Sequence, residues 1–210
     1  YEPITQLTGG VPVHIATRAE DQFRLTADQL RAAITPRTKL LIFPYPNNPT
    51  GAVMSAAEME EIAAVLRETN VLVLSDEIYS ELTYGLDRHV SIASLPGMAE
   101  RTIVVNGFSK SYAMTGWRLG YVIAPAPIIE RAKKVHDFLT VGAAAPLQEA
   151  IIPGLRFGQD YYDDLLAKYT HKRDLFCKGL DALGLVHNVP QGAYYVMMDI
   201  SEFGYDSDLK

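Results

Sequence analysis

The sequence has few of the features that mark secreted, membrane-spanning or nucleic-acid-binding chains. It contains one cysteine, Cys177, in 210 residues, which excludes an internal disulfide and fits a reducing, cytoplasmic setting. Acidic residues outnumber basic ones by 25 to 19, and a net charge of −6 offers no basic patch for nucleic acid or anionic lipid. No apolar run approaches the ~20 residues needed to cross a bilayer. The five histidines show no ligand spacing with Cys177, so no metal site is expected.

What the sequence does contain is an alternation of strand-like and helix-like segments. Strands are expected at 11–15, 38–43, 71–74, 102–105, 119–124 and 193–200, and helices at 26–34, from 55 onward, at 127–138 and at 160–183. Thr26 and Ser55 are suitable N-caps, and Ser55 forms a capping-box pattern with Glu58. The continuously apolar segment 71–74 is typical of a parallel strand covered on both faces. Strands separated by helices predict an α/β fold with a mostly parallel sheet.

Three polar runs follow these expected strands, at 45–51, 75–79 and 106–121. In the third run Lys110 follows a strand, and Arg118 comes eight positions later. A primary amine is the side chain that can hold an aldehyde cofactor as a Schiff base, and the planar fork of an arginine suits a phosphate. Lys110 alone would be typical of a surface lysine, so the evidence is the ordered set of motifs.

Asn48, Asp76, Tyr79, Lys110 and Arg118, in that order, resemble the signature of the class I/II aminotransferases, which are fold type I pyridoxal-phosphate (PLP) enzymes. The resemblance covers essentially the whole chain, from Tyr-Glu-Pro-Ile at the start to Gly-Ala-Tyr-Tyr-Val near the end. It implies a three-layer large domain with a mostly parallel sheet and the start of a smaller α+β domain. The expected divisions are 1–158 for the PLP-binding domain, 159–184 for an interdomain helix and 185–210 for the small domain. A preceding segment and most of the small domain are expected to lie outside this chain.

The resemblance also implies roles for individual residues. Lys110 would hold the cofactor and then move a proton between the substrate and the cofactor. Asp76 would face the pyridine nitrogen and favour its protonated form, since an opposite charge raises proton affinity. Tyr79 and Asn48 would donate to the ring oxygen, and Asn48 would lie near the substrate carboxylate. Without the resemblance, Asp76 and Asn48 would equally suit plain turns, and Tyr79 would suit aromatic packing.

Phosphate binding is implied for Ser109 and Arg118, although a hydroxyl at Ser109 could equally cap a turn. The sequence departs from many relatives at Gly107, where they place a serine three residues before the lysine. Three neighbours of the motifs are given no chemical role. Glu77 is expected to face solvent or a helix end, and Trp117, like Tyr112, is expected to pack in the wall of the site.

The implied function is a PLP-dependent aminotransferase, which moves an amino group between an L-amino acid and a 2-oxo acid in a ping-pong cycle through a Lys110 Schiff base. A carbon–sulfur β-lyase and an aminocyclopropane-carboxylate synthase type of enzyme would share the same cofactor residues. A PLP-sensing transcription regulator is the alternative from another class, and the acidic charge balance gives it no support. A homodimer is expected from the resemblance, without nucleic-acid or membrane partners.

Overall fold

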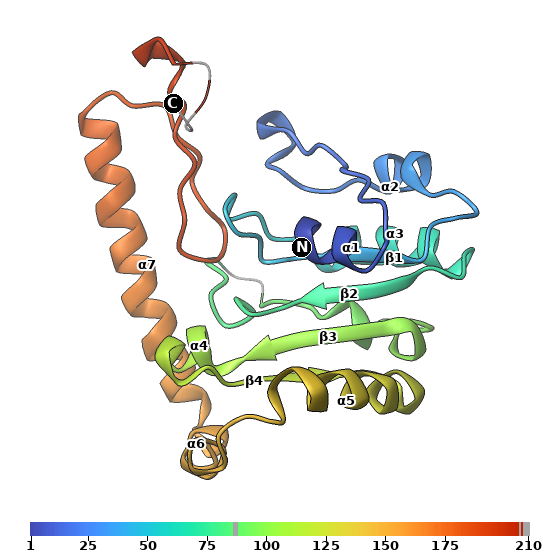
Figure 1. Cartoon of the computed structure of the whole chain (residues 1–210). Helices are drawn as coiled ribbons and strands as arrows, with labels where there is room; N and C mark the ends of the chain where they lie inside the picture. The colour runs from blue at the N-terminus through green and yellow to red at the C-terminus, as the bar shows by residue number, and fades with distance from the viewer. Residues whose placement is uncertain (86–87, 206, 208–210) are drawn as a thin grey trace.

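The protein is described here by a computed structural model that covers residues 1–85, 88–205 and 207 (Figure 1). Its centre is a four-stranded sheet in the order β1 (Leu40–Phe43), β2 (Leu72–Asp76), β3 (Thr102–Gly107) and β4 (Gly120–Ile123). The pairs β1–β2 and β2–β3 are parallel, and β3–β4 is antiparallel. The mostly parallel α/β sheet predicted from the sequence is confirmed.

Seven α-helices are found in the described residues: α1 (Glu2–Leu7), α2 (Ala27–Ala33), α3 (Ala56–Arg67), α4 (Phe108–Ser111), α5 (Ala126–Thr140), α6 (Ala145–Ile151) and α7 (Gln159–Ala182). Both predicted N-caps are confirmed. The Thr26 hydroxyl accepts from the backbone N–H of Gln29, and Ser55 forms a complete capping box with Glu58. These bonds satisfy backbone donors that the first helical turn would otherwise leave unpaired. None of the described helices is both long and apolar enough to cross a membrane.

The main core lies between α3 and one face of the sheet. Its buried members from α3 include Met59, Ile62 and Leu66, which meet Phe43 of β1 and Val73 of β2. The other face of β2 is more open, since Leu72 is 36% exposed. The expectation that segment 71–74 is covered on both faces is therefore wrong for the described residues.

The connection between β3 and β4 explains why β4 is antiparallel. It holds only the four-residue helix α4 and a short 3₁₀ turn, whereas a parallel return needs a longer crossover, usually with a full helix. The chain therefore turns back at once, and Gly107 pairs with Gly120. As a result, the end of β3 and the start of β4 lie at the same edge of the sheet as the ends of β1 and β2.

Two predicted strands do not form. Residues 11–15 have no regular secondary structure, and the segment 193–200 makes only an isolated bridge, between His187 and Met198. Segment 193–200 has a strand-like composition, but among the described residues no neighbouring strand continues the ladder, so backbone pairing stops after one bridge.

Helix α7 stands across the end of the sheet toward which β2 and β3 point, and the chain after it returns beside that edge (Figure 1). It ends at Ala182, and Gly184 follows with a φ of +70°, the left-handed conformation that glycine adopts most readily. Leu165 and Cys177 are its buried residues, whereas the apolar side chains of Leu175 and Phe176 are 65% and 57% exposed.

Candidate active site

The predicted site residues lie at one edge of the sheet because of its topology. Asp76 is the last residue of β2, and Lys110 lies in α4, directly after β3. Arg118 comes two residues before the antiparallel β4, and Asn48 lies in the turn after β1. The carboxyl edge of parallel strands is where open α/β sheets bind ligands.

Lys110 points toward two tyrosines. Its Nζ atom lies 2.5 Å from the hydroxyl oxygen of Tyr194, and 5.5 Å and 5.1 Å from the ring centroids of Tyr79 and Tyr194. The two rings meet edge to face, with centroids 5.2 Å apart. The structure thus places the amine of Lys110 against Tyr79, a predicted site residue, and against Tyr194, to which the sequence analysis assigns no role.

Tyr79 is 3% exposed, and its hydroxyl donates to that of Tyr195 at 3.1 Å. Burial, followed by the hydrogen bond with Tyr195, raises the pKa of Tyr79 far above its ordinary value, so its phenol remains a proton donor. Tyr194 stacks on Tyr169 of α7 at 5.7 Å. Tyr194 and Tyr195 are adjacent in the Gly-Ala-Tyr-Tyr run, which is part of the family resemblance. No sequence pattern indicated that this run would lie beside Lys110.

The carboxylate of Asp76 is half-buried and held in place from its own turn. One oxygen accepts from the backbone N–H of Ile78 at 3.2 Å, and the other accepts from the hydroxyl of Tyr1. Burial and this bond to Asp76 raise the pKa of Tyr1 well above its ordinary range. One carboxylate oxygen of Asp76 is thus bound within its own turn, and the other accepts a hydrogen bond from a distant residue, Tyr1.

Of the two adjacent asparagines, only Asn47 is used within the turn. Its side chain accepts from the backbone N–H and the hydroxyl of Thr50 and donates to the carbonyl of Pro44. Asn48 is exposed, and its side-chain amide makes no hydrogen bond within the described part of the chain. Asn48 is therefore the asparagine of the pair whose side-chain amide has no partner in the part of the chain that the structure describes.

Of the predicted site residues, only Tyr79 lies against the amine of Lys110; no contact in the described residues joins that amine to Asn48 or Asp76, or to the side chains of Arg118 and Ser109. Arg118 is exposed in a left-handed backbone conformation, with φ of 54°, and Nη1 donates to the carbonyl of Thr115 at 2.9 Å. Ser109 uses its carbonyl to accept from the Thr115 hydroxyl at 3.1 Å. Thr115 thus ties the two candidate phosphate ligands to one loop.

Aromatic packing braces the short helix that carries Lys110. Tyr112 stacks on Tyr161 of α7, and its hydroxyl lies 2.6 Å from that of Tyr162. The hydroxyl of Tyr161 donates to the carbonyl of Ser111 at 3.0 Å. The predicted packing role of Tyr112 and Trp117 is confirmed, since both lie against the buried cluster around Phe108.

Glu77 was expected to face solvent or a helix end, and this is wrong. Its residue is 4% exposed, and one carboxylate oxygen accepts from the hydroxyls of Ser75 at 2.9 Å and Ser91 at 2.7 Å. The other oxygen lies 3.0 Å from Nε2 of His89. The sequence could not show this because two of the three partners come from a segment more than ten residues away.

Backbone hydrogen bonds attach the segment that carries Tyr194 to the loops that contain Gly51 and Leu82. The N–H groups of Gln191 and Gly192 both donate to the carbonyl of Gly51, and that of Ala193 donates to the carbonyl of Leu82. The side chain of Asn188 donates to the carbonyl of Thr50 at 2.6 Å. These bonds fix the approach of Tyr194 to Lys110.

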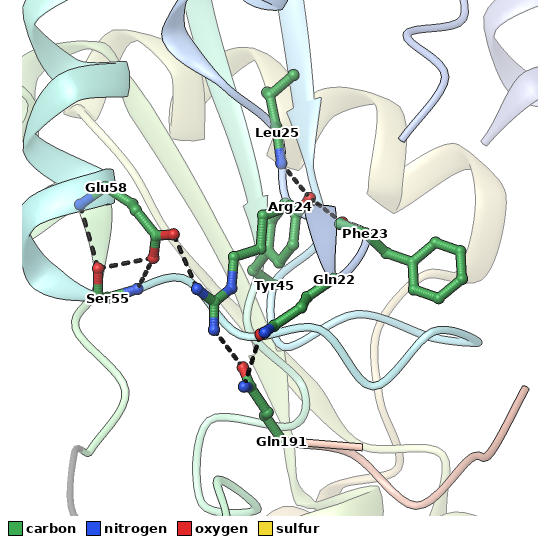
Figure 2. A network of polar contacts seen from close by, with 8 residues as sticks. All are labelled: Gln22, Phe23, Arg24, Leu25, Tyr45, Ser55, Glu58 and Gln191. Carbon is green, nitrogen blue, oxygen red and sulfur yellow. Dashed lines mark hydrogen bonds and ion pairs between the residues drawn. The ribbon is translucent and has the colours of Figure 1, made fainter. Parts of the chain in front are cut away.

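Figure 2 shows a polar network that adds side-chain bonds to this attachment. Arg24 donates to Glu58 at 3.0 Å and to Gln191 at 2.5 Å, and Gln191 donates to Gln22 at 2.9 Å. Glu58 also closes the capping box with Ser55. The start of α3 and the segment after α7 are thus joined through Arg24.

The donor set fits a phosphorylated pyridine aldehyde. It offers an amine at Lys110, a carboxylate at Asp76 that already accepts a phenolic hydrogen, and an unpaired amide at Asn48. The described residues contain no group of three or more His, Cys, Asp or Glu side chains that could hold a metal ion.

Comparison with known proteins agrees with this reading. The family Aminotransferase class I and II matches residues 1–206. The chain is 40% identical to aromatic-amino-acid aminotransferase 2 from Thermococcus litoralis and 42% identical to aspartate aminotransferase from Pyrococcus abyssi. Each match covers 99% of this chain and 54% of the relative, so the chain spans about half the length of these relatives.

Solved structures show the same likeness. The aromatic aminotransferase from Pyrococcus horikoshii OT3 matches with a TM-score of 0.92 and 42% identity, over 98% of this chain and 56% of that one. The aspartate aminotransferase from Thermus thermophilus with maleate matches with a TM-score of 0.90 and 37% identity, over 96% of this chain and 53% of that one. The fold is that of the large domain of fold type I aminotransferases. The chain belongs to the class I and II aminotransferases, a family that uses pyridoxal phosphate.

Proposed function

We propose that this chain is part of a PLP-dependent aminotransferase that moves an amino group between an L-amino acid and a 2-oxo acid in a ping-pong cycle. The observation that carries the proposal is the amine of Lys110, which faces the phenols of Tyr79 and Tyr194 at the sheet edge that Asp76 terminates. The relatives named for aspartate and aromatic amino acids support these two substrate classes first.

When bound, pyridoxal phosphate supplies an aldehyde and an electron-withdrawing ring. Lys110 would hold the aldehyde group through Nζ, and its free amine would carry the proton from the substrate Cα. Asp76 holds a proton on the ring nitrogen through its second carboxylate oxygen. Tyr79 would turn its phenolic hydrogen, which Tyr195 accepts in this structure, toward the ring oxygen.

The outer parts of the site are assigned to exposed groups. Asn48 donates its free amide to the ring oxygen and the substrate carboxylate. Arg118 binds the phosphate with the remaining N–H groups of its fork, and Ser109 contributes its hydroxyl. Arg118 is exposed, and within the described part of the chain its bond to Thr115 is the one that would compete for these donors.

The domain division also remains a proposal. Residues 1–158 form the cofactor domain, 159–184 the interdomain helix and 185–210 the start of a small domain, of which 206 and 208–210 lie outside the described residues. The match of α7, Gln159–Ala182, to the proposed linker supports this division. The protein works as a cytoplasmic homodimer, by analogy with its family.

The test is covalent capture in the full-length protein. The protein is mixed with PLP and reduced with borohydride, and the modified residue is found by mass spectrometry. Amino transfer to a 2-oxo acid is then measured over a panel of L-amino acids. Lys110→Ala should lose both capture and transfer while its far-UV circular dichroism is unchanged, and the exposed Lys134→Ala should behave like the parent.

The outcomes separate the candidate activities. Capture on Lys110 with amino transfer supports the aminotransferase and names its donor. Capture without transfer, together with thiol release from a cysteine conjugate, would replace it with a β-lyase. Covalent cofactor that persists in Lys110→Ala would contradict the lysine assignment.

A further inference from the structure

A buried carboxylate stands directly beside Asp76 and takes no part in the proposed chemistry. The side chain of Glu77 is 5% exposed, and that of its partner His89 is 6% exposed. Removing a carboxylate from water is costly unless partners compensate it. Burial raises the pKa of Glu77, but His89 and the hydroxyls of Ser91 and Ser75 lower it more, so the pKa lies below its ordinary value and the group stays charged.

The backbone of Glu77 is held as firmly as its side chain. Its N–H donates to the carbonyl of Val105 in β3 at 2.9 Å, and its carbonyl accepts from the N–H of Ser80 at 2.9 Å. Ser80 in turn accepts from the side chain of Asn106 at 3.2 Å. Glu77 is therefore the point where β2 leaves the sheet and the turn toward Tyr79 begins.

Strand geometry places Glu77 opposite Asp76. Successive side chains of an extended chain point to opposite faces, so Ser75 and Glu77 share the buried side while Asp76 faces the site. Ser75 is 1% exposed, in keeping with this alternation. A carboxylate tethered on the buried side restrains the backbone from which the Asp76 carboxylate and, two residues beyond Glu77, the Tyr79 phenol project.

The tethers come from a separate segment of the chain. His89 and Ser91 follow the turn by more than ten residues, and Ser91 also caps the 3₁₀ helix Ile92–Ser94 by accepting from the N–H of Ala93. Ile92 is fully buried in the main core beside α3. The restraint on Glu77 is thus anchored in the core of the domain.

We propose that Glu77, clamped by His89, Ser75 and Ser91, is a positioning residue that holds Asp76 and Tyr79 in register for the cofactor. This role rests on the proposed function, because it concerns the same site. If Glu77 served stability alone, replacing it would lower only the melting temperature. If Glu77 positions Asp76 and Tyr79, replacing it also changes how the bound cofactor is held.

The test compares Glu77→Gln with Glu81→Gln in the full-length protein. Glu81 is a matched control, since it is a partly buried carboxylate four residues further on that makes no hydrogen bond or ion pair with Ser75, His89 or Ser91 in the described residues. Three quantities are measured: the PLP dissociation constant of the apo-protein, the induced circular dichroism of the bound cofactor, and hydrogen exchange at the amides of Ile78 and Ser80 in the apo-protein.

Glu77→Gln should weaken PLP binding by about tenfold to a hundredfold, the loss typical when a residue that orients the ligands of a metal site is replaced. It should also change the induced circular dichroism and speed up exchange at Ile78 and Ser80, whereas Glu81→Gln should change none of these. A dissociation constant within about twofold of the parent's, with unchanged exchange, would overturn the positioning role.

Two further comparisons keep the result interpretable. If Glu77→Gln does not fold, Ser91→Ala removes a single tether and keeps the contact between Glu77 and His89, and it should show the same changes at a smaller size. Parent-like values in Ser91→Ala would then overturn the proposal. If the parent protein itself fails to bind PLP, the proposed function fails, and hydrogen exchange alone still decides whether Glu77 restrains the turn.

Discussion

The ε-amine of Lys110 donates a 2.5 Å hydrogen bond to the hydroxyl of Tyr194, a residue 84 positions further along the chain. The segment that carries Tyr194 reaches Lys110 because its backbone is docked on Gly51 and Leu82. The surroundings of the lysine amine therefore depend on residues from both sides of the long helix α7.

Tyr194→Phe removes the acceptor of the Lys110 amine but keeps the ring. A hydrogen bond to a charged group contributes about 1.5–3 kcal/mol when buried, and less at this half-exposed site. The bond also fixes the direction of the Lys110 amine, and a less well-oriented amine reacts more slowly. We expect capture of PLP on Lys110 to slow by severalfold, up to about tenfold. Stopped-flow absorbance measures this rate. Tyr205→Phe, at a tyrosine that is 57% exposed, is the control, and equal rates in the two variants would contradict the prediction.

Gly51→Ala should detach the segment around Pro190. A β-carbon at Gly51 would lie 2.4 Å from Cβ of Pro190, and its φ of +69° is unfavourable for alanine. Gly184→Ala is a matched control, since φ is +70° there but nothing lies within 4 Å. The control should lose about 1–2 kcal/mol of unfolding free energy, and Gly51→Ala about 1–3 kcal/mol more. Equal losses in denaturant unfolding would show that the predicted clash does not occur.

Ser55→Ala should weaken the start of α3. It removes the side-chain acceptor for the backbone N–H of Glu58 and a hydroxyl that donates to the Glu58 carboxylate at 2.6 Å. Loss of an N-cap costs about 1 kcal/mol, which chemical denaturation resolves. Glu61→Ala, at an exposed position within α3, should stay within about 0.5 kcal/mol of the parent. A Ser55→Ala protein as stable as this control would argue against the cap.

His187 should make stability depend on pH. Its Nδ1 lies 2.8 Å from the carbonyl oxygen of Asn188, and its Nε2 lies 3.1 Å from a carboxylate oxygen of Asp181. The carbonyl of Asn188, followed by Asp181, raises the pKa of His187 above its ordinary value of 6.5. A raised pKa in the folded state stabilises the protein fully below about pH 6.5, and this contribution is lost as the pH rises through the folded-state pKa.

The measurement is the melting temperature of the parent and of His187→Asn between about pH 5 and 9. The advantage of the parent should be largest at the acid end and should shrink as the pH rises. His14→Asn, at a histidine whose side chain is 72% exposed, is the control. A parent advantage that grows with pH would reverse the sign of the predicted linkage.

Much of the fold could be predicted because its signals are local. The caps at Thr26 and Ser55 involve residues three positions apart, and the strands that became β1 to β4 are short apolar runs. The two failed strands show the limit of such signals. Residues 11–15 and 193–200 have strand-like composition, but a strand also needs a partner, and partners are set by tertiary structure.

The sequence by itself determined the family, the order of the strands along the chain and the motif residues Asn48, Asp76 and Lys110, because each is encoded within a few adjacent positions. Only the tertiary structure decided that Tyr194 meets Lys110 and that Glu77 is buried against His89 and Ser91. The physical reason is distance along the chain. A contact between residues far apart depends on how helices, turns and strands pack, and no local pattern of residue types records that packing.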